Sequence, residues 1–152
     1  MFLSAVMAFV HHCAAFILVA SLGIEATLLQ LPLTIPVAQR VQKADLLFGV
    51  SAAVALLVGL LRVTFFEKGG AYYWHNAYFL TKFFAFLVAG LISIYPTLTF
   101  LSWRRSMRSG SAPTAQEHVV RRLRLCLTLE ALLIIVVLGC AALMARGFGT
   151  IS

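Results

Sequence analysis

Four long apolar runs, each long enough to cross a lipid bilayer as a helix, constrain this chain more than any other feature. Residues 2–24 contain no Asp, Glu, Lys or Arg, and similar runs with few charges cover 46–66, 77–103 and 123–146. About 20 helical residues span a hydrocarbon layer about 30 Å thick. We therefore predict an all-α integral membrane four-helix bundle, in which residues 1–152 form a single four-span transmembrane domain.

The composition excludes a water-soluble globular domain. Charged residues make up only 11% of the chain, whereas soluble domains contain roughly 25%. Cys13, Cys126 and Cys140 all lie in apolar runs and form no Cys-x-x-Cys pair, so they indicate neither a disulfide framework nor a zinc finger. The first run is too long for a signal-peptide core, which predicts a retained span.

Proline, glycine and helix-capping residues predict where the spans are interrupted. The segment 31–36 contains two prolines and should end the first helix, and 39–44 should form a short basic connector. The Ser/Gly/Pro-rich stretch 106–115 should be a flexible loop. Thr114 and Glu117 have the spacing of a capping box, which places the start of the fourth helix beside them.

Glycines within the apolar runs carry no side chain that would hold neighbouring helices apart. Small residues allow helices in a membrane to approach one another closely. We therefore expect Gly49, Gly59, Gly90 and Gly139 to lie at contacts between helices.

The basic residues are concentrated on one side of the predicted membrane. Arg40 and Lys43 follow the first span, and six arginines between 104 and 124 surround the loop before the fourth. Loops rich in Lys and Arg face the cytoplasm, so both termini should lie on the outer (periplasmic) side of a bacterial inner (plasma) membrane. The net charge of +7 is then explained by the basic cytoplasmic loops of a multi-pass protein in a lipid bilayer. We therefore predict no nucleic-acid partner.

Four nitrogen-bearing side chains share one depth in the outer half of the predicted bundle. His11 and His12 lie near the middle of the first span, and Arg62 and Lys82 lie about 9–10 Å outward of the middle of theirs, at ~1.5 Å per residue. An ionisable group in lipid costs about 2.5–3.5 kcal/mol, so each should face the bundle interior and find a partner there.

A bound cofactor with negative charges and a metal would satisfy these groups together. Haem b has an iron that binds imidazole and two propionates that bind Arg or Lys. We take Lys82 and Arg62 as candidate catalytic residues, and His11 and His12 as candidate metal ligands. The candidate cofactor-binding residues are His11, His12, Lys82, Arg62, Lys68 and His75. Adjacent histidines point about 100° apart on a helix, so at most one of the pair aims at a central cofactor.

Two acidic residues lie instead in the cytoplasmic half. Glu25 follows His11 by fourteen residues, which is about four helical turns, so both should share the face that looks into the bundle. Glu25 and Glu130 together suggest a proton path. Structural ion pairs, such as Glu130 with Arg40, are the alternative.

The order of several motifs resembles known membrane families. The motifs are His11-His12 with Ser21-Leu-Gly23, Asp45-Leu-Leu-Phe-Gly49 with Gly59-Leu-Leu-Arg62, and Tyr73-Trp-His75 with Lys82. This order resembles the HemJ type of protoporphyrinogen oxidase and, more loosely, the CopD-like membrane proteins. In the HemJ type, haem b is thought to be held by a first-span histidine and a third-span lysine, which implies His11 or His12 and Lys82.

A second resemblance covers nearly the whole chain. It is carried by Arg62-Val, Glu67-Lys68-Gly69, Tyr72-Tyr73, His75-Asn76, Lys82, Pro96 and Trp103-Arg104-Arg105. These residues are similar to a bacterial family of predicted four-span membrane proteins of unknown function. The resemblance implies the fold and the membrane location, and it brings no activity.

Three functions stay open at this point. The first is a haem-binding redox protein with a porphyrin substrate or an electron-transfer partner, which would make a haem-dependent oxidoreductase the enzyme class. The second is a CopD-like carrier of a metal or small ligand that uses His11, His12 and Cys13. The third is a non-catalytic membrane subunit, and the chain could also form a homo-oligomer.

Overall fold

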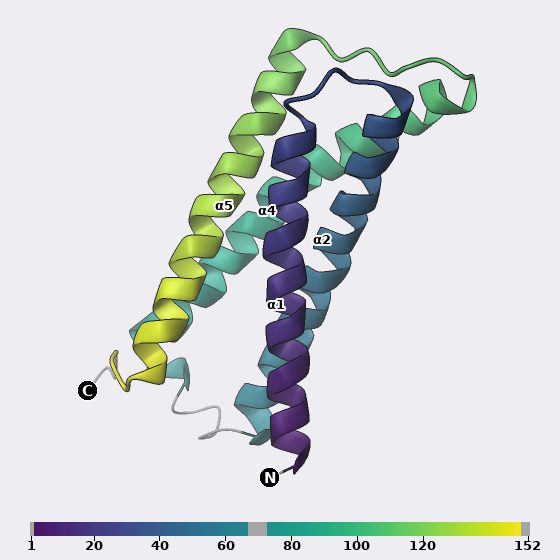
Figure 1. Cartoon of the computed structure of the whole chain (residues 1–152). Coiled ribbons are helices and arrows are strands. Elements are labelled where there is room, and N and C mark those ends of the chain that lie inside the picture. The colour runs from purple at the N-terminus through teal and green to yellow at the C-terminus, as the bar shows by residue number, and fades with distance from the viewer. Residues whose placement is uncertain (1, 67–72, 150–152) are drawn as a thin grey trace.

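The computed structural model shows four long helices arranged as a bundle (Figure 1). It describes residues 2–66 and 73–149. The helices are α1 (Phe2–Leu28), α2 (Ile35–Leu61), α4 (Ala77–Arg108) and α5 (Glu117–Ala145), and the short π-helical segment η1 (Arg62–Phe66) directly follows α2. All four α-helices are long and apolar enough to cross a membrane. The predicted all-α fold with four spans is confirmed.

Helix α2 begins earlier than we expected because the residues after α1 form a good helix start. The Thr34 hydroxyl caps the helix by accepting a hydrogen bond from the Val37 N–H at 3.4 Å. Pro36 lies in the first turn, where its missing N–H leaves no bond unmade. The prediction of a connector at 39–44 is therefore wrong, since these residues are helical and Val41 is fully buried.

The connection between α4 and α5 is shorter than the predicted loop and spans 109–116. Helix α4 continues to Arg108, because arginine is a good helix former and its charge suits a helix C-terminus. Helix α5 begins at Glu117 without a side-chain cap hydrogen bond. The capping box predicted at Thr114 therefore does not form.

The bundle consists of two antiparallel hairpins, α1–α2 and α4–α5. The helices within each hairpin contact one another extensively, whereas the hairpins meet through the smaller contacts of α2 with α4 and of α1 with α5. We call the end of the bundle that carries 29–34 and 109–116 the loop end, and the opposite end the termini end. The main hydrophobic core joins the hairpins toward the loop end. Its buried members include Leu22, Val41, Phe48, Phe100, Trp103, Leu123 and Leu127.

The outward surface of the helices is apolar, as contact with lipid requires. Large exposed side chains include Phe9, Phe16, Leu57, Leu91 and Ile135. The start of α1 and the end of α5 lie at the termini end of the bundle in Figure 1, opposite the arginines in the last turns of α4 and the first turns of α5. This arrangement agrees with four crossings, and the side of the membrane that each end faces stays a prediction.

The expected role of the span glycines is wrong for three of the four. A Cβ atom added at Gly49, Gly90 or Gly139 would meet nothing within 4 Å, so these glycines face away from the neighbouring helices. At Gly59 the same atom would lie 3.1 Å from His11 Cε1. Gly59 therefore makes room for the His11 ring.

Candidate functional site

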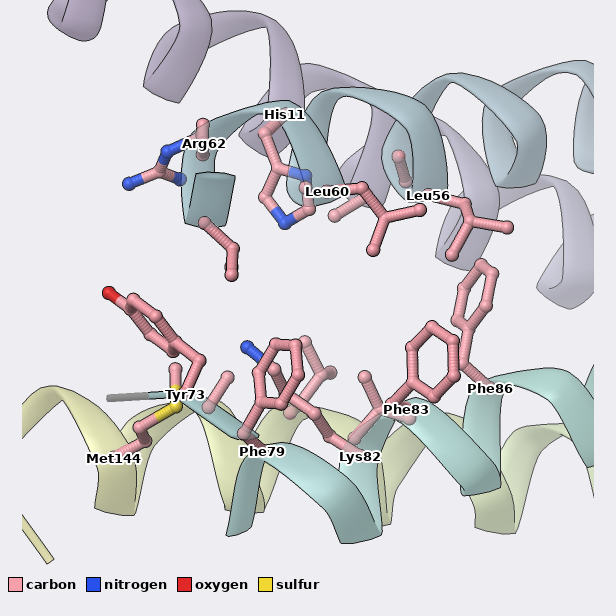
Figure 2. Close-up of a pocket in the computed structure, with 17 residues that line it drawn as sticks. His11, Leu56, Leu60, Arg62, Tyr73, Phe79, Lys82, Phe83, Phe86 and Met144 are labelled. Atoms are coloured by element: carbon pink, nitrogen blue, oxygen red, sulfur yellow. The ribbon is translucent and has the colours of Figure 1, made fainter. Parts of the chain in front are cut away.

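A cavity of about 210 Å³ lies between the two hairpins in the half of the bundle nearer the termini end. Residues of α1, α2 and η1 line one side and residues of α4 and α5 line the other, and the two sides face each other in Figure 2. The lining is mostly apolar, but it includes three nitrogen-bearing side chains, His11, Arg62 and Lys82. The structure thus brings these three predicted site residues to one cavity.

His11 reaches the cavity from α1. Its ring is half-buried, and the Nδ1 atom is buried without a hydrogen-bond partner. Figure 2 shows the imidazole directed from the α1 side toward the open space in front of α4. The Nδ1 edge of the ring lies against Gly59, where an added Cβ atom would be 3.5 Å away, so Nε2 is the nitrogen directed to the cavity. An imidazole nitrogen in this position can donate or accept a hydrogen bond or bind a metal.

Lys82 and Arg62 reach the same cavity from α4 and η1. The Lys82 Nζ atom lies 5.2 Å from the centroid of the Phe79 ring, within the range of a cation–π interaction. Arg62 is the first residue of a π-helical segment, a form of backbone that is frequent at functional sites. Both cations are half-buried and act electrostatically on His11. An anionic ligand group would be attracted to this part of the cavity.

Aromatic rings form much of the α4 side of the cavity. Phe79 is buried, and its centroid lies 5.4 Å from that of Tyr73 and 6.2 Å from that of Phe83. The Phe79 and Phe83 rings are nearly parallel, at 14°. Phe86 continues the wall toward the centre of the bundle. The cavity therefore combines an apolar aromatic wall with positive charges, which suits an amphipathic anion.

Two other predicted site residues within the described part of the chain, His12 and His75, do not line this cavity. His12 is exposed and its Nδ1 lies 2.7 Å from the Ala8 carbonyl oxygen of the same helix. The two histidine rings are 6.1 Å apart between centroids and inclined at 78°. His75 is exposed, and Lys68 lies outside the described residues.

Glu25 and Glu130 both turn into the bundle, as the helical spacing from His11 predicts for Glu25. Each is only 1% exposed. The ion pair expected between Glu130 and Arg40 does not form, because Arg40 is exposed and Glu130 Oε1 has no hydrogen-bond partner. The electrostatic neighbours of Glu130 include instead a second buried acid, Asp45.

Asp45 was missed as a site residue because it stands next to the basic residues before the second apolar run. From the sequence, a charged residue in that position is expected at the end of a membrane span, outside the bundle core. The signal that could have found it is the helix start at Thr34 and Pro36, which places Asp45 about three turns inside α2. It is 9% exposed and accepts a hydrogen bond from the Thr97 hydroxyl at 2.7 Å.

Four apolar helices with polar groups held between them define an α-helical integral membrane protein with intramembrane polar sites. The chain belongs to the family described as predicted membrane proteins (DUF2214), whose family model matches residues 3–149. This agrees with the resemblance found for a family of predicted four-span proteins.

No curated protein and no solved structure matches the chain. The resemblance to the HemJ type and to the CopD-like proteins therefore stays a prediction. The family description states a membrane location and no activity, so the function must be argued from the cavity and its residues.

Proposed function

We propose that the protein binds haem b in the cavity between its hairpins and takes part in electron transfer or porphyrinogen oxidation. The observation that carries the proposal is the His11 imidazole. Its ring is half-buried and faces a cavity that Lys82 enters from the opposite hairpin.

The residues around the cavity fit the chemical parts of haem b. An imidazole can bind the iron, positive side chains can bind the propionates, and aromatic rings can pack against the macrocycle. His11 would be the iron ligand, and Lys82 would be a second ligand or a proton donor. Arg62 would hold a propionate. Bound haem would supply the redox chemistry, while the helices would set its environment.

The size of the cavity adds a requirement to the proposal. Its volume of about 210 Å³ lies below the roughly 300–1,000 Å³ of pockets that enclose drug-sized ligands. The hairpins would have to separate at the termini end to admit a macrocycle. Their contacts with each other are few compared with those inside each hairpin, and the main core lies toward the other end. The hairpins could therefore separate at the termini end while the main hydrophobic core near the loop end stays packed.

The two alternative functions receive less support from the geometry. A metal carrier needs His11, His12 and Cys13 to converge, but the His12 ring is held beside its own backbone on the exposed side of α1. Within residues 2–66 and 73–149, no group of three or more His, Cys, Asp or Glu side chains is arranged to hold a metal ion. A non-catalytic subunit gives no reason for a half-buried imidazole that shares a cavity with two cationic side chains.

The two adjacent histidines provide a matched test. Purified protein should be titrated with haem in detergent, and its absorption spectrum recorded in the oxidised and reduced states. We expect a Soret band shifted from that of free haem in the wild type and in His12→Ala, and no such shift in His11→Ala, because His11 alone of the pair borders the cavity. Lys82→Met should shift the band or weaken haem binding.

The same titration gives results that would reject the proposal. A wild-type protein that leaves the Soret band of the added haem at the position it has in detergent alone would exclude haem b as the ligand. Equal effects of His11→Ala and His12→Ala would exclude the cavity as its site. Full retention of function and partner assembly in Lys82→Met would favour the non-catalytic subunit.

A further inference from the structure

Three carboxyl side chains from three different helices lie buried together toward the loop end. Glu25 comes from α1, Asp45 from α2 and Glu130 from α5, and their exposed fractions are 1%, 9% and 1%. They interact electrostatically: Glu25 with both other carboxyls, and Glu130 with Asp45. We call these three residues the carboxyl cluster.

The polar contacts of the carboxyl cluster are few. Asp45 accepts one hydrogen bond, from the Thr97 hydroxyl of α4 at 2.7 Å. Glu25 Oε1 and Glu130 Oε1 are buried and have no hydrogen-bond partner. A buried ionised carboxylate needs a cation or several donors to replace its lost hydration. The two glutamates have neither in the part of the chain that the structure describes.

No basic side chain among the described residues neutralises the cluster. The basic residues of α2 and α5 that lie nearest to the cluster in sequence, Arg40, Lys43 and Arg124, are all exposed. Cys126 interacts with Glu130, whereas the Arg124 Nη2 atom donates to the Leu29 carbonyl oxygen at 2.9 Å. Helix α4 contributes only the neutral Thr97 hydroxyl to Asp45.

The spacing of the carboxyls favours protons over a metal ion as the neutralising species. The described part of the chain contains no group of three acidic, His or Cys side chains close enough to hold a metal. Protonation, in contrast, neutralises each carboxyl where it lies and turns an acceptor into a donor for its neighbour. Ionisable groups kept within membrane helices commonly serve proton relays.

We propose that Glu25, Asp45 and Glu130 form an intramembrane proton-binding site that is mostly protonated at neutral pH and exchanges protons with the loop end of the bundle. The site is separate from the cavity that His11 borders, because Glu25 lies fourteen residues, or about 21 Å, further along α1. The proposal of a proton-binding site therefore does not depend on haem binding in that cavity.

A second cavity is the candidate route for this exchange. It has a volume of about 530 Å³ and lies between α1 and α5. Its polar lining residues are Gln30, Arg124 and Thr128, near the loop end. Further in, it is lined by Ala26 and Ala131, which adjoin Glu25 and Glu130 in sequence. Glu25 and Glu130 do not line this cavity themselves, so the proposal requires water that enters from the loop end to pass beside these alanines to reach them.

Infrared spectroscopy of the full chain in detergent tests the proposal. Protonated carboxyl groups have a C=O stretching band that ionised carboxylates lack, and the band shifts in D2O. At pH 7 we expect this band in the wild type and a partial loss of it in Glu25→Gln and in Glu130→Gln. Glu117→Gln is the matched control, since Glu117 lies exposed on α5 and should be ionised.

Gln has nearly the shape of a protonated Glu, so both variants should keep their helices and their thermal unfolding transition. An absent wild-type band at pH 7 would overturn the proposal without reference to any variant. Equal bands in the wild type and both cluster variants would also overturn it. Loss of the band when Na⁺ replaces choline at constant pH would assign the cluster to a metal cation instead.

Discussion

His11 and His12 show how strongly a single step along a helix changes the environment of a side chain. One helical step rotates a side chain by about 100°. That rotation places the His11 ring beside the cavity and leaves the His12 ring exposed next to Ala8. The sequence alone predicted that only one of the two histidines could point toward the centre of the bundle. Which member faces the bundle depends on how α1 is rotated against α2, and packing sets that rotation.

Gly59 lets us test the position of the His11 ring. In Gly59→Ala the new methyl group would lie 3.1 Å from His11 Cε1, so the ring must shift into the cavity. We expect haem affinity to fall about tenfold, the lower end of the effects seen when groups that orient a ligand are changed. Haem titration followed by the Soret band measures this change.

The control for Gly59→Ala is Gly49→Ala in the same helix. A methyl group at Gly49 meets nothing within 4 Å. This variant should therefore gain up to about 1 kcal/mol from helix propensity and bind haem as the wild type does. Equal haem affinities in both variants would show that the His11 ring position is not held by Gly59.

At the scale of elements, the apolar runs predicted the helices well and their ends poorly. The runs mark where lipid surrounds a helix, and hydropathy therefore located all four. Helix α2 starts before its apolar run, and helix α4 ends after its own run. The mainly polar segments 39–44 and 104–108 extend the two helices because they contain no helix-breaking residue. Hydropathy does not report on helices that continue into water.

The start of α4 depends on Asn76, which is fully buried. Its Oδ1 accepts a hydrogen bond from the Phe79 N–H at 3.2 Å and its Nδ2 donates to the Phe148 carbonyl oxygen at 3.1 Å. The Ala77 N–H donates to the Gly149 carbonyl oxygen at 2.9 Å. One side chain thus caps α4 and joins it to the segment that follows α5.

We expect Asn76→Ala to lower the free energy of unfolding by about 1–3 kcal/mol, since it removes a helix cap and leaves buried groups without partners. The residues after α5 should also become more sensitive to protease. The control is Gln116→Ala at the N-cap of α5, whose side chain makes no cap bond. It should change stability by no more than about 0.5 kcal/mol. Thermal unfolding in detergent compares the two, and similar losses would contradict the role of Asn76.

At the scale of the whole molecule, the distribution of charge predicts how the bundle sits in the membrane. The basic residues at the end of α4, the start of α5 and the start of α2 all lie toward the loop end. Positive loops stay on the cytoplasmic side during insertion. The termini end, with the haem cavity that we propose, should therefore face outward.

Cysteine labelling tests this orientation. In a background where Cys13, Cys126 and Cys140 are replaced by Ala, a membrane-impermeant maleimide should label Phe2→Cys in right-side-out membranes. It should label Ser111→Cys only in inverted membranes. Both positions are exposed in the structure and lie at opposite ends of the bundle. The reverse pattern would place the termini in the cytoplasm.

The number of spans, their helical form and the predicted orientation follow from local hydropathy and charge, because the bilayer acts on each segment separately. The sites depend on contacts between segments. Asp45 joins Glu25 and Glu130 through the packing of α1, α2 and α5, and Gly59 makes room for His11 through the packing of α1 on α2. The rotation and register of each helix arise from side-chain packing with its neighbours, and no single segment carries that information.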